Sequence, residues 1–167
     1  MVSLKYALYR LEWWLAKYWP AKRPTHLDIE IASACNLKCT FCPQSLEKKK
    51  FPVKFMEPLL FEKIIAEAHW LKIPSIKLNL RGEATLHPEF KELCENIKGK
   101  FLDIRLNTNG NYPVALNEII AETFTEVCFS VDAFMEDTYK SIRVGGNWEL
   151  LNDYMARLYR LLRGKKG

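Results

Sequence analysis

The sequence alternates between a strand-like and a helix-like hydrophobic pattern four times, which restricts the fold more than its composition does. In the first strand-like segment, Leu27, Ile29 and Ile31 alternate with Asp28 and Glu30. A period of two is typical of a β-strand. The same period recurs at residues 76–80, 102–106 and 127–131. Apolar residues at helical spacing predict helices over 58–71, 89–97, 114–123, 135–142 and 148–162. This order predicts an α/β fold of four parallel strand–helix units with right-handed crossovers.

Polar residues follow the end of each predicted strand. A cysteine-rich loop follows the first strand, and Arg81-Gly82-Glu83 follows the second. Asn107 to Gly110 follows the third, and Ser130 and Asp132 lie at the end of the fourth. The carboxyl ends of parallel strands meet at one edge of the sheet, which is where such folds carry their chemistry. We therefore expect these four segments to converge.

The loop after the first strand holds Cys35, Cys39 and Cys42 at C-x-x-x-C-x-x-C spacing. Three thiolates so close together can ligate three irons of a four-iron cluster and leave one iron open for chemistry. The alternative is a zinc site, which would need a fourth ligand such as His26 or His87. Cys94 and Cys128 lie among apolar residues of a predicted helix and a predicted strand, so we predict that both are buried packing residues.

The amino-terminal segment predicts an amphipathic helix that ends at Pro20. Leu4, Leu8, Leu11 and Leu15 recur at helical spacing, with tryptophans and basic residues around them. Interspersed charges and the lack of a small-residue cleavage site argue against a signal peptide. Packing of this helix on the domain is the favoured interpretation, and contact with a membrane surface or a partner is the alternative. We assign residues 1–24 to this helix and its linker, and 25–167 to the core domain.

Composition excludes some classes of protein. The 167 residues suffice for one domain with a real core, and a hydrophobic fraction of 49% argues against disorder. The net charge of +5 does not argue for nucleic-acid binding. Five cysteines, three of them clustered, make a disulfide framework a poor interpretation and favour a reducing, cytoplasmic setting. No apolar run reaches the roughly 18 residues of a membrane span. Lys48-Lys49-Lys50 is expected to be a solvated loop.

Five motifs together resemble the radical S-adenosylmethionine (radical SAM) superfamily: CNLKCTFCP, RGEATLHPEF, NTNG, FSVDA and SIRVGGNWELL. The last is similar to a turn and helix in peptide- and cofactor-modifying (SPASM-like) relatives. The resemblance runs from about Thr25 to Leu162. It implies a partial (β/α) barrel of six strand–helix units, of which this sequence supplies about four. The chain therefore looks like a core domain that is incomplete at its carboxyl end, through truncation, a split gene or an incomplete reading frame.

The resemblance also implies a reaction and its cofactors. The family binds S-adenosylmethionine at the open iron of a [4Fe–4S] cluster and cleaves it reductively. The resulting 5′-deoxyadenosyl radical abstracts hydrogen from a substrate, here a peptide or a small metabolite. The electron donor is expected to be a protein such as flavodoxin or ferredoxin. Two alternatives stay open: a non-catalytic iron–sulfur electron-transfer module or inactive fragment, and a zinc-binding structural domain.

Site residues carry over by position. The resemblance implies that Cys35, Cys39 and Cys42 are the iron ligands and that Phe41 contacts the adenine side of the cofactor. Gly82 and Glu83 would hold the methionine ammonium, and Ser130 would bind the methionine carboxylate or the ribose. Asn109 and Asp132 would line the same cavity. The chain departs from the family's motif at two positions. Arg81 replaces the first glycine of Gly-Gly-Glu, and Ala84 replaces the proline that usually follows the glutamate.

Overall fold

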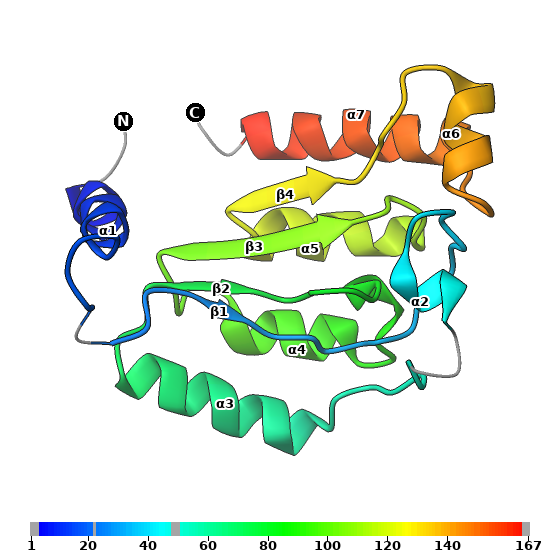
Figure 1. Cartoon of the computed structure of the whole chain (residues 1–167). Coiled ribbons are helices and arrows are strands. Elements are labelled where there is room, and N and C mark those ends of the chain that lie inside the picture. Colours follow the sequence, from blue (N-terminus) through cyan, green and yellow to red (C-terminus); the bar gives the residue numbers. More distant parts are fainter. Residues whose placement is uncertain (1–3, 22, 48–50, 165–167) are drawn as a thin grey trace.

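Four parallel strands form the centre of the protein. The computed structural model describes residues 4–21, 23–47 and 51–164, so the predicted lysine loop at 48–50 lies outside the described residues. The strands lie side by side in chain order, each parallel to the next, as Figure 1 shows. They are β1 (Leu27–Asp28), β2 (Ser75–Lys77), β3 (Asp103–Thr108) and β4 (Glu126–Phe129). The predicted α/β fold is therefore confirmed.

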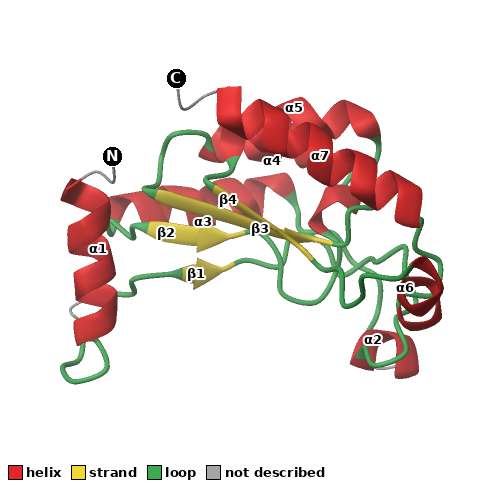
Figure 2. Cartoon of the chain, turned by 90° about the horizontal axis from the view of Figure 1, so that it is seen from above, coloured by secondary structure: helices red, strands yellow, loops and turns green. Residues whose placement is uncertain are grey.

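The long helices that follow the strands cover one face of the sheet. Viewed as in Figure 2, four of them lie on the same side of the strands: α3 (Pro58–Trp70), α4 (Phe90–Ile97), α5 (Asn117–Thr123) and α7 (Trp148–Gly164). Two short helices, α2 (Pro43–Leu46) and α6 (Glu136–Ile142), lie beyond the carboxyl ends of the strands. Two single 3₁₀ turns complete the described elements, η2 (Ala84–Leu86) and η3 (Val114–Leu116).

The core lies between the sheet and these helices. Ile104 and Leu106 of β3 are buried on the helix side, and Phe90 of α4 stacks on Phe124 with ring centroids 6.3 Å apart. Arg105, between the two buried strand residues, lies on the opposite face and pairs with Asp103 at 2.7 Å. Each large apolar side chain buried in this layer contributes about 1.5–3 kcal/mol. The period of two in the sequence therefore sets which face of each strand meets the helices.

The first strand is shorter than its alternating pattern predicts. Ile29 still donates its backbone N–H to Lys77, at 2.8 Å. The carbonyl of Ile31 instead accepts from Met56, at 2.8 Å, and Ala32 forms an antiparallel bridge with Phe55. The chain thus leaves β2 after Ile29 and pairs with the segment that precedes α3. Because of this change of partner, the chain bends away from β2, and the cysteine loop lies across the carboxyl edge of the sheet.

The prediction for the two outlying cysteines is half right. Cys94 is fully buried in α4, as expected, but Cys128 is exposed. Cys128 lies on β4, the last strand of the described sheet, between Val127 and Phe129, which pack against the core. Because side chains alternate along a strand, Cys128 points away from the described helices that cover the core side of the sheet. An apolar run could not reveal that one face of this strand is open.

The predicted amino-terminal helix forms, but it ends at Leu15 rather than at Pro20 and packs less than expected. Helix α1 (Leu4–Leu15) buries only Tyr9 among its described residues, and Leu4, Leu8 and Leu11 are exposed. It lies at the amino ends of the strands, away from the cysteine loop (Figures 1 and 2). In the described part of the chain, no helix combines the length and apolar character that crossing a membrane requires.

Candidate functional site

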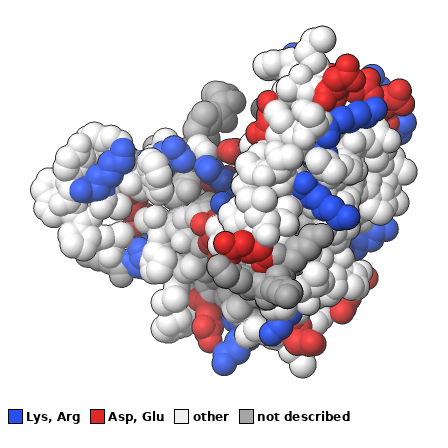
Figure 3. All heavy atoms as spheres, turned by 45° about the vertical axis from the view of Figure 1, so that its right-hand side comes forward, with Lys and Arg blue, Asp and Glu red and all other residues white. Residues whose placement is uncertain are grey.

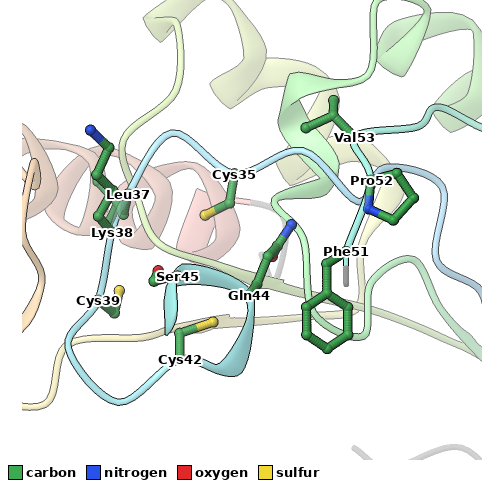
Figure 4. Close-up of a pocket in the computed structure, with 10 residues that line it drawn as sticks. All are labelled: Cys35, Leu37, Lys38, Cys39, Cys42, Gln44, Ser45, Phe51, Pro52 and Val53. Atoms are coloured by element: carbon green, nitrogen blue, oxygen red, sulfur yellow. The ribbon is translucent and has the colours of Figure 1, made fainter. Parts of the chain in front are cut away.

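The three clustered cysteines lie around one cavity of about 280 Å³ at the carboxyl edge of the sheet. Figure 4 shows their side chains around this space, with Gln44, Ser45 and Phe51 completing its wall. All three thiols are free: Cys35 is exposed, Cys42 is half-buried and Cys39 is buried. Leu37, between the first two cysteines, is 4% exposed and anchors the loop in the protein. The loop therefore presents three sulfur ligands to a common space.

Backbone hydrogen bonds fix this loop from two sides. On one side, Glu83 donates its N–H to the carbonyl of Ala34, at 2.7 Å. On the other, Lys38 donates to Val144 at 2.8 Å, and Thr40 donates to Ile142 at 3.0 Å. Segments more than 40 residues away in the chain thus hold both ends of the cysteine cluster. The loop is positioned by the tertiary structure rather than by its own secondary structure.

Gly82 is required by the close approach of the loop before Cys35. A Cβ atom at this position would lie 1.9 Å from the carbonyl oxygen of Ala32 and 2.9 Å from that of Ala34. Both contacts are with backbone, which cannot swing aside as a side chain can. The glycine that the sequence motif singles out therefore lets the segment between β2 and η2 lie against the cysteine loop.

Glu83 is 2% exposed and braces the end of β3. Its Oε1 accepts from the hydroxyls of Thr85, at 2.7 Å, and Thr108, at 2.9 Å, and its Oε2 accepts from the N–H of Asn109, at 2.7 Å. Burial raises the pKa of Glu83 above its ordinary value, and these hydrogen bonds oppose the rise. A carboxylate has about four acceptor positions, so part of its capacity remains on Oε2.

A chain of asparagines joins the cysteine loop to β3. The Asn109 amide donates to Oδ1 of Asn36, at 2.8 Å, and lies 3.8 Å from the sulfur of Cys35. The Asn36 amide in turn donates to the carbonyl of Asn111, at 2.6 Å. Asn109 thus lies beside the first cysteine, although it is not among the residues that line the cavity around the three cysteines. Asn111 was not singled out from the sequence, because an amide in a turn has no characteristic spacing.

Arg143 is a site residue that the sequence reasoning did not identify. Its Nη1 lies 3.6 Å from the Cys39 sulfur, and its guanidinium carbon lies 5.3 Å from the ring centroid of Phe41. It also pairs with the carboxylate of Asp132. The motif SIRVGGNWELL contains this arginine, but only the fold shows that the α6–α7 turn brings it to the cysteines. It gives the buried sulfur of Cys39 a cationic neighbour.

The two residues after β4 occupy different positions. Ser130 is half-buried, and its N–H donates to the carbonyl of Thr108 at 2.9 Å, which holds the end of β4 against β3. Asp132 is exposed, has a positive φ of 62°, and pairs with Arg143. Neither lines the cavity around the three cysteines. Phe41 is 56% exposed, so its ring is open to solvent at the outer side of the loop.

The donor set fits an iron–sulfur cluster better than a single metal ion. Among the described residues, no group of three or more His, Cys, Asp or Glu side chains is placed to hold one metal ion. The suggested fourth zinc ligands are engaged elsewhere: His26 with Ser75, at 2.7 Å, and His87 with the carbonyl of Met56, at 2.9 Å. Three thiols spread around a cavity suit a multi-iron cluster with one iron lacking a protein ligand.

Partial desolvation and the neighbouring Glu83 raise the pKa of the Cys35 thiol above its ordinary value. The thiolate is the form that binds a metal. Loading of a cluster on this loop would therefore release protons.

Comparison with known proteins gives one family model, described as the radical SAM superfamily, that matches residues 29–163. A probable GTP 3′,8-cyclase of Pyrococcus horikoshii is 32% identical over 119 residues, which are 71% of this chain and 37% of that protein. A tungsten-containing aldehyde ferredoxin oxidoreductase cofactor-modifying protein of Pyrococcus furiosus is 33% identical over 89 residues, covering 51% of this chain and 24% of that protein. The chain thus spans less than half the length of these curated relatives.

Solved structures share the fold. SuiB of Streptococcus suis, bound to S-adenosylmethionine, matches with a TM-score of 0.72 and 19% identity, over 88% of this chain and 34% of that one. Methylornithine synthase matches with a TM-score of 0.64 and 14% identity, over 96% of this chain and 50% of that one. These similarities place the four strand–helix units in a partial-barrel arrangement.

Proposed function

The chain belongs to the radical SAM superfamily, and from this premise we propose that it binds a [4Fe–4S] cluster through Cys35, Cys39 and Cys42 and S-adenosylmethionine beside it. Members of the superfamily are enzymes that carry out S-adenosylmethionine-dependent radical chemistry with an iron–sulfur cluster. The observation that carries the proposal is the arrangement of the three free thiols around one cavity at the carboxyl edge of the sheet.

When bound and reduced, these cofactors supply a 5′-deoxyadenosyl radical that abstracts hydrogen from a substrate. The contribution of this chain is to hold the sulfur ligands and set their surroundings. Asn109 lies at the sulfur of Cys35, and Arg143 lies at that of Cys39. Donors near the sulfurs stabilise negative charge on a cluster and thereby favour its reduced form. Backbone hydrogen bonds from Glu83 to the carbonyl of Ala34, and from Lys38 to the carbonyl of Val144, hold the loop beside both donors.

The remaining site residues are proposed to bind S-adenosylmethionine. Gly82 lets the segment after β2 lie against the loop, and Glu83 retains acceptor capacity on Oε2 for the methionine ammonium. We assign Ser130 to the methionine carboxylate or the ribose, and Phe41, whose ring is exposed, to the adenine. Asp132 is assigned to orienting Arg143, with which it pairs.

The proposed substrate is a small metabolite or a peptide. The curated relatives are named for a GTP cyclisation and for modification of a cofactor, and both names favour a small molecule. A SuiB structure that contains the precursor peptide SuiA shares the fold, and a peptide is the substrate that the SPASM-like motif implies. The proposed electron donor is a flavodoxin or a ferredoxin, in the reducing cytoplasm, where free thiols persist.

Anaerobic reconstitution tests the cofactor assignment. The purified protein should take up about four irons and four sulfides per chain and turn brown. Cys35→Ala, Cys39→Ala and Cys42→Ala should each lower the iron content strongly. Cys128→Ala is the matched control, because this cysteine is exposed but lies outside the cavity, and it should load like the unchanged protein. Full loading of all three loop variants would refute the assignment.

Cofactor cleavage distinguishes an enzyme from a binding module. Reconstituted protein incubated with S-adenosylmethionine and dithionite should form 5′-deoxyadenosine, measured by liquid chromatography. A cluster that loads but yields no 5′-deoxyadenosine would show a non-catalytic iron–sulfur module or an inactive fragment. Stoichiometric zinc in protein purified without oxygen, with no iron uptake, would show a zinc domain instead.

A further inference from the structure

One side of α1 carries a stripe of large apolar side chains that are exposed in the described structure, with Leu8 at the edge of the groove between this helix and the body. Leu4, Leu8 and Leu11 are 75%, 56% and 51% exposed, at the successive spacings of four and three residues that place them on one side of a helix. Trp14 is 49% exposed in the next turn. Tyr9, at 4% exposure, is the single described residue of α1 buried against the body. A contiguous row of exposed, large apolar side chains on a protein surface is typical of a contact surface.

Aromatic and basic residues accompany this stripe. The guanidinium carbon of Arg10 lies 4.9 Å from the centroid of the Trp13 ring, and the Lys17 ammonium lies 5.7 Å from it. Glu12 is the acidic residue among the described positions of α1, and Arg23 already pairs with it at 3.2 Å. The helix therefore offers uncompensated positive charge beside its apolar surface.

The body of the protein extends this positive charge. A groove runs between α1 and the loops that precede β2 and β3, and Lys5, Lys72 and Lys100 lie along it. All three lysines are exposed. In Figure 3 the lobe at the left, where α1 lies in Figure 1, is mostly uncharged and carries Lys and Arg side chains. The amino end of the sheet thus combines an apolar ridge with a basic rim.

We propose that α1 and this basic rim bind the surface of an anionic lipid bilayer. Leucines and tryptophans would enter the boundary between headgroups and acyl chains, and the lysines and arginines would contact anionic headgroups. Amphipathic helices with aromatic residues and a basic polar side bind membranes in this way, lying in the interface without spanning it.

Charge favours a bilayer over a second copy of the chain. Two copies paired through Leu4, Leu8 and Leu11 would bring two basic helices together, with Glu12 of each already engaged by Arg23. Like charges across such a contact oppose association, whereas an anionic surface attracts every one of them.

The position of α1 sets how the protein would be oriented on the bilayer. Helix α1 lies at the amino ends of the strands, and the cysteine loop with α2 lies at their carboxyl ends (Figures 1 and 2). A protein attached through α1 would keep its cysteine cavity away from the lipid, open to an electron donor and to substrate.

Vesicle co-sedimentation tests the proposal without depending on the cofactors. The probes are vesicles of phosphatidylcholine alone and of two parts phosphatidylcholine to one part phosphatidylserine. We expect binding to the mixed vesicles that weakens with salt, and little binding to phosphatidylcholine alone. Reversing Arg10 and Lys17 to Glu should lower the partition coefficient at least about twentyfold, since each basic residue near the surface contributes about fivefold.

A second pair of variants tests the apolar stripe. Leu11→Asp should weaken binding at least about tenfold, because it removes a leucine that the bilayer would bury. Leu59→Asp is the matched control, since Leu59 is 80% exposed on α3, and it should bind like the unchanged protein. Equal binding of the Leu11 and Leu59 variants would overturn the proposal. So would failure to bind the mixed vesicles, or a dimer in sedimentation equilibrium that Leu11→Asp dissociates.

Discussion

Substituting Gly82 by alanine tests how the segment between β2 and η2 positions the cysteine loop. The added Cβ would lie 1.9 Å from the carbonyl oxygen of Ala32, so the two backbones must separate by about 1 Å or more to reach ordinary contact. Ala34, whose carbonyl would lie 2.9 Å from the new atom, accepts the N–H of Glu83 in the present structure. The substitution therefore pushes the loop away from the bonds that hold it.

The expected cost follows from these contacts. Forcing a methyl group into a packed site costs about 1–3 kcal/mol. Weakening the Glu83–Ala34 hydrogen bond adds about 1 kcal/mol. A total of about 2–4 kcal/mol should lower the unfolding midpoint by roughly 5–15 °C for a chain of this size. Because the displaced segment leads into Cys35, the variant should also bind less iron on reconstitution.

Thermal unfolding of cluster-free protein, followed by circular dichroism without oxygen, measures the first effect, and iron analysis measures the second. Gly99→Ala is the control, because Gly99 has a positive φ of 73°, whereas no atom of the described structure beyond its chain neighbours lies within 4 Å of the added Cβ. It should cost about 1–2 kcal/mol for its conformation alone and leave iron uptake intact. Equal midpoints and equal iron contents for the two variants would refute the reasoning.

Other substitutions separate site residues from packing residues. Asn109→Ala removes the amide beside the Cys35 sulfur, and we expect a lower cluster reduction potential, measured by redox titration, with the fold retained because the backbone of Asn109 still donates to Glu83. Burial raises the pKa of Glu83 in the folded protein above its ordinary value of 4.5. The contribution of Glu83 to the free energy of unfolding is therefore greatest at a pH below 4.5, and it falls as the pH rises through the pKa of the folded state. In urea titrations between about pH 4 and pH 8, Glu83→Gln should remove this decrease in the free energy of unfolding. An unchanged pH profile would contradict a raised pKa of Glu83. Cys94→Ser should destabilise the protein by about 1–3 kcal/mol with iron uptake unchanged, since this thiol is buried away from the cavity, and Cys128→Ser should alter neither quantity.

Much of the fold is readable from the sequence because hydrophobic period reports local geometry. The four strand–helix units and their parallel order follow from patterns such as Ile104 and Leu106 on one face of β3. The extent of each strand is less predictable. Residues 27–31 keep a strand pattern throughout, but after Ile29 the chain pairs with the segment at Met56, a partner that local alternation cannot specify. Cys128 was misplaced for a related reason: its burial depends on what covers the other face of β4.

The sequence by itself determined the three-cysteine loop and the segments that follow each strand, because spacing fixes which side chains can reach one cluster and parallel strands bring their ends together. Only the tertiary structure decided how Gly82, Glu83 and Arg143 act. Gly82 permits a close approach of two backbones that a Cβ would prevent. Glu83 is buried and holds the end of β3 by hydrogen bonds, and the α6–α7 turn brings Arg143 to the Cys39 sulfur. Each depends on contacts between residues distant in the chain, which no local pattern encodes. The same holds for α1, whose amphipathic period is evident in the sequence, while its exposure depends on where the fold places it.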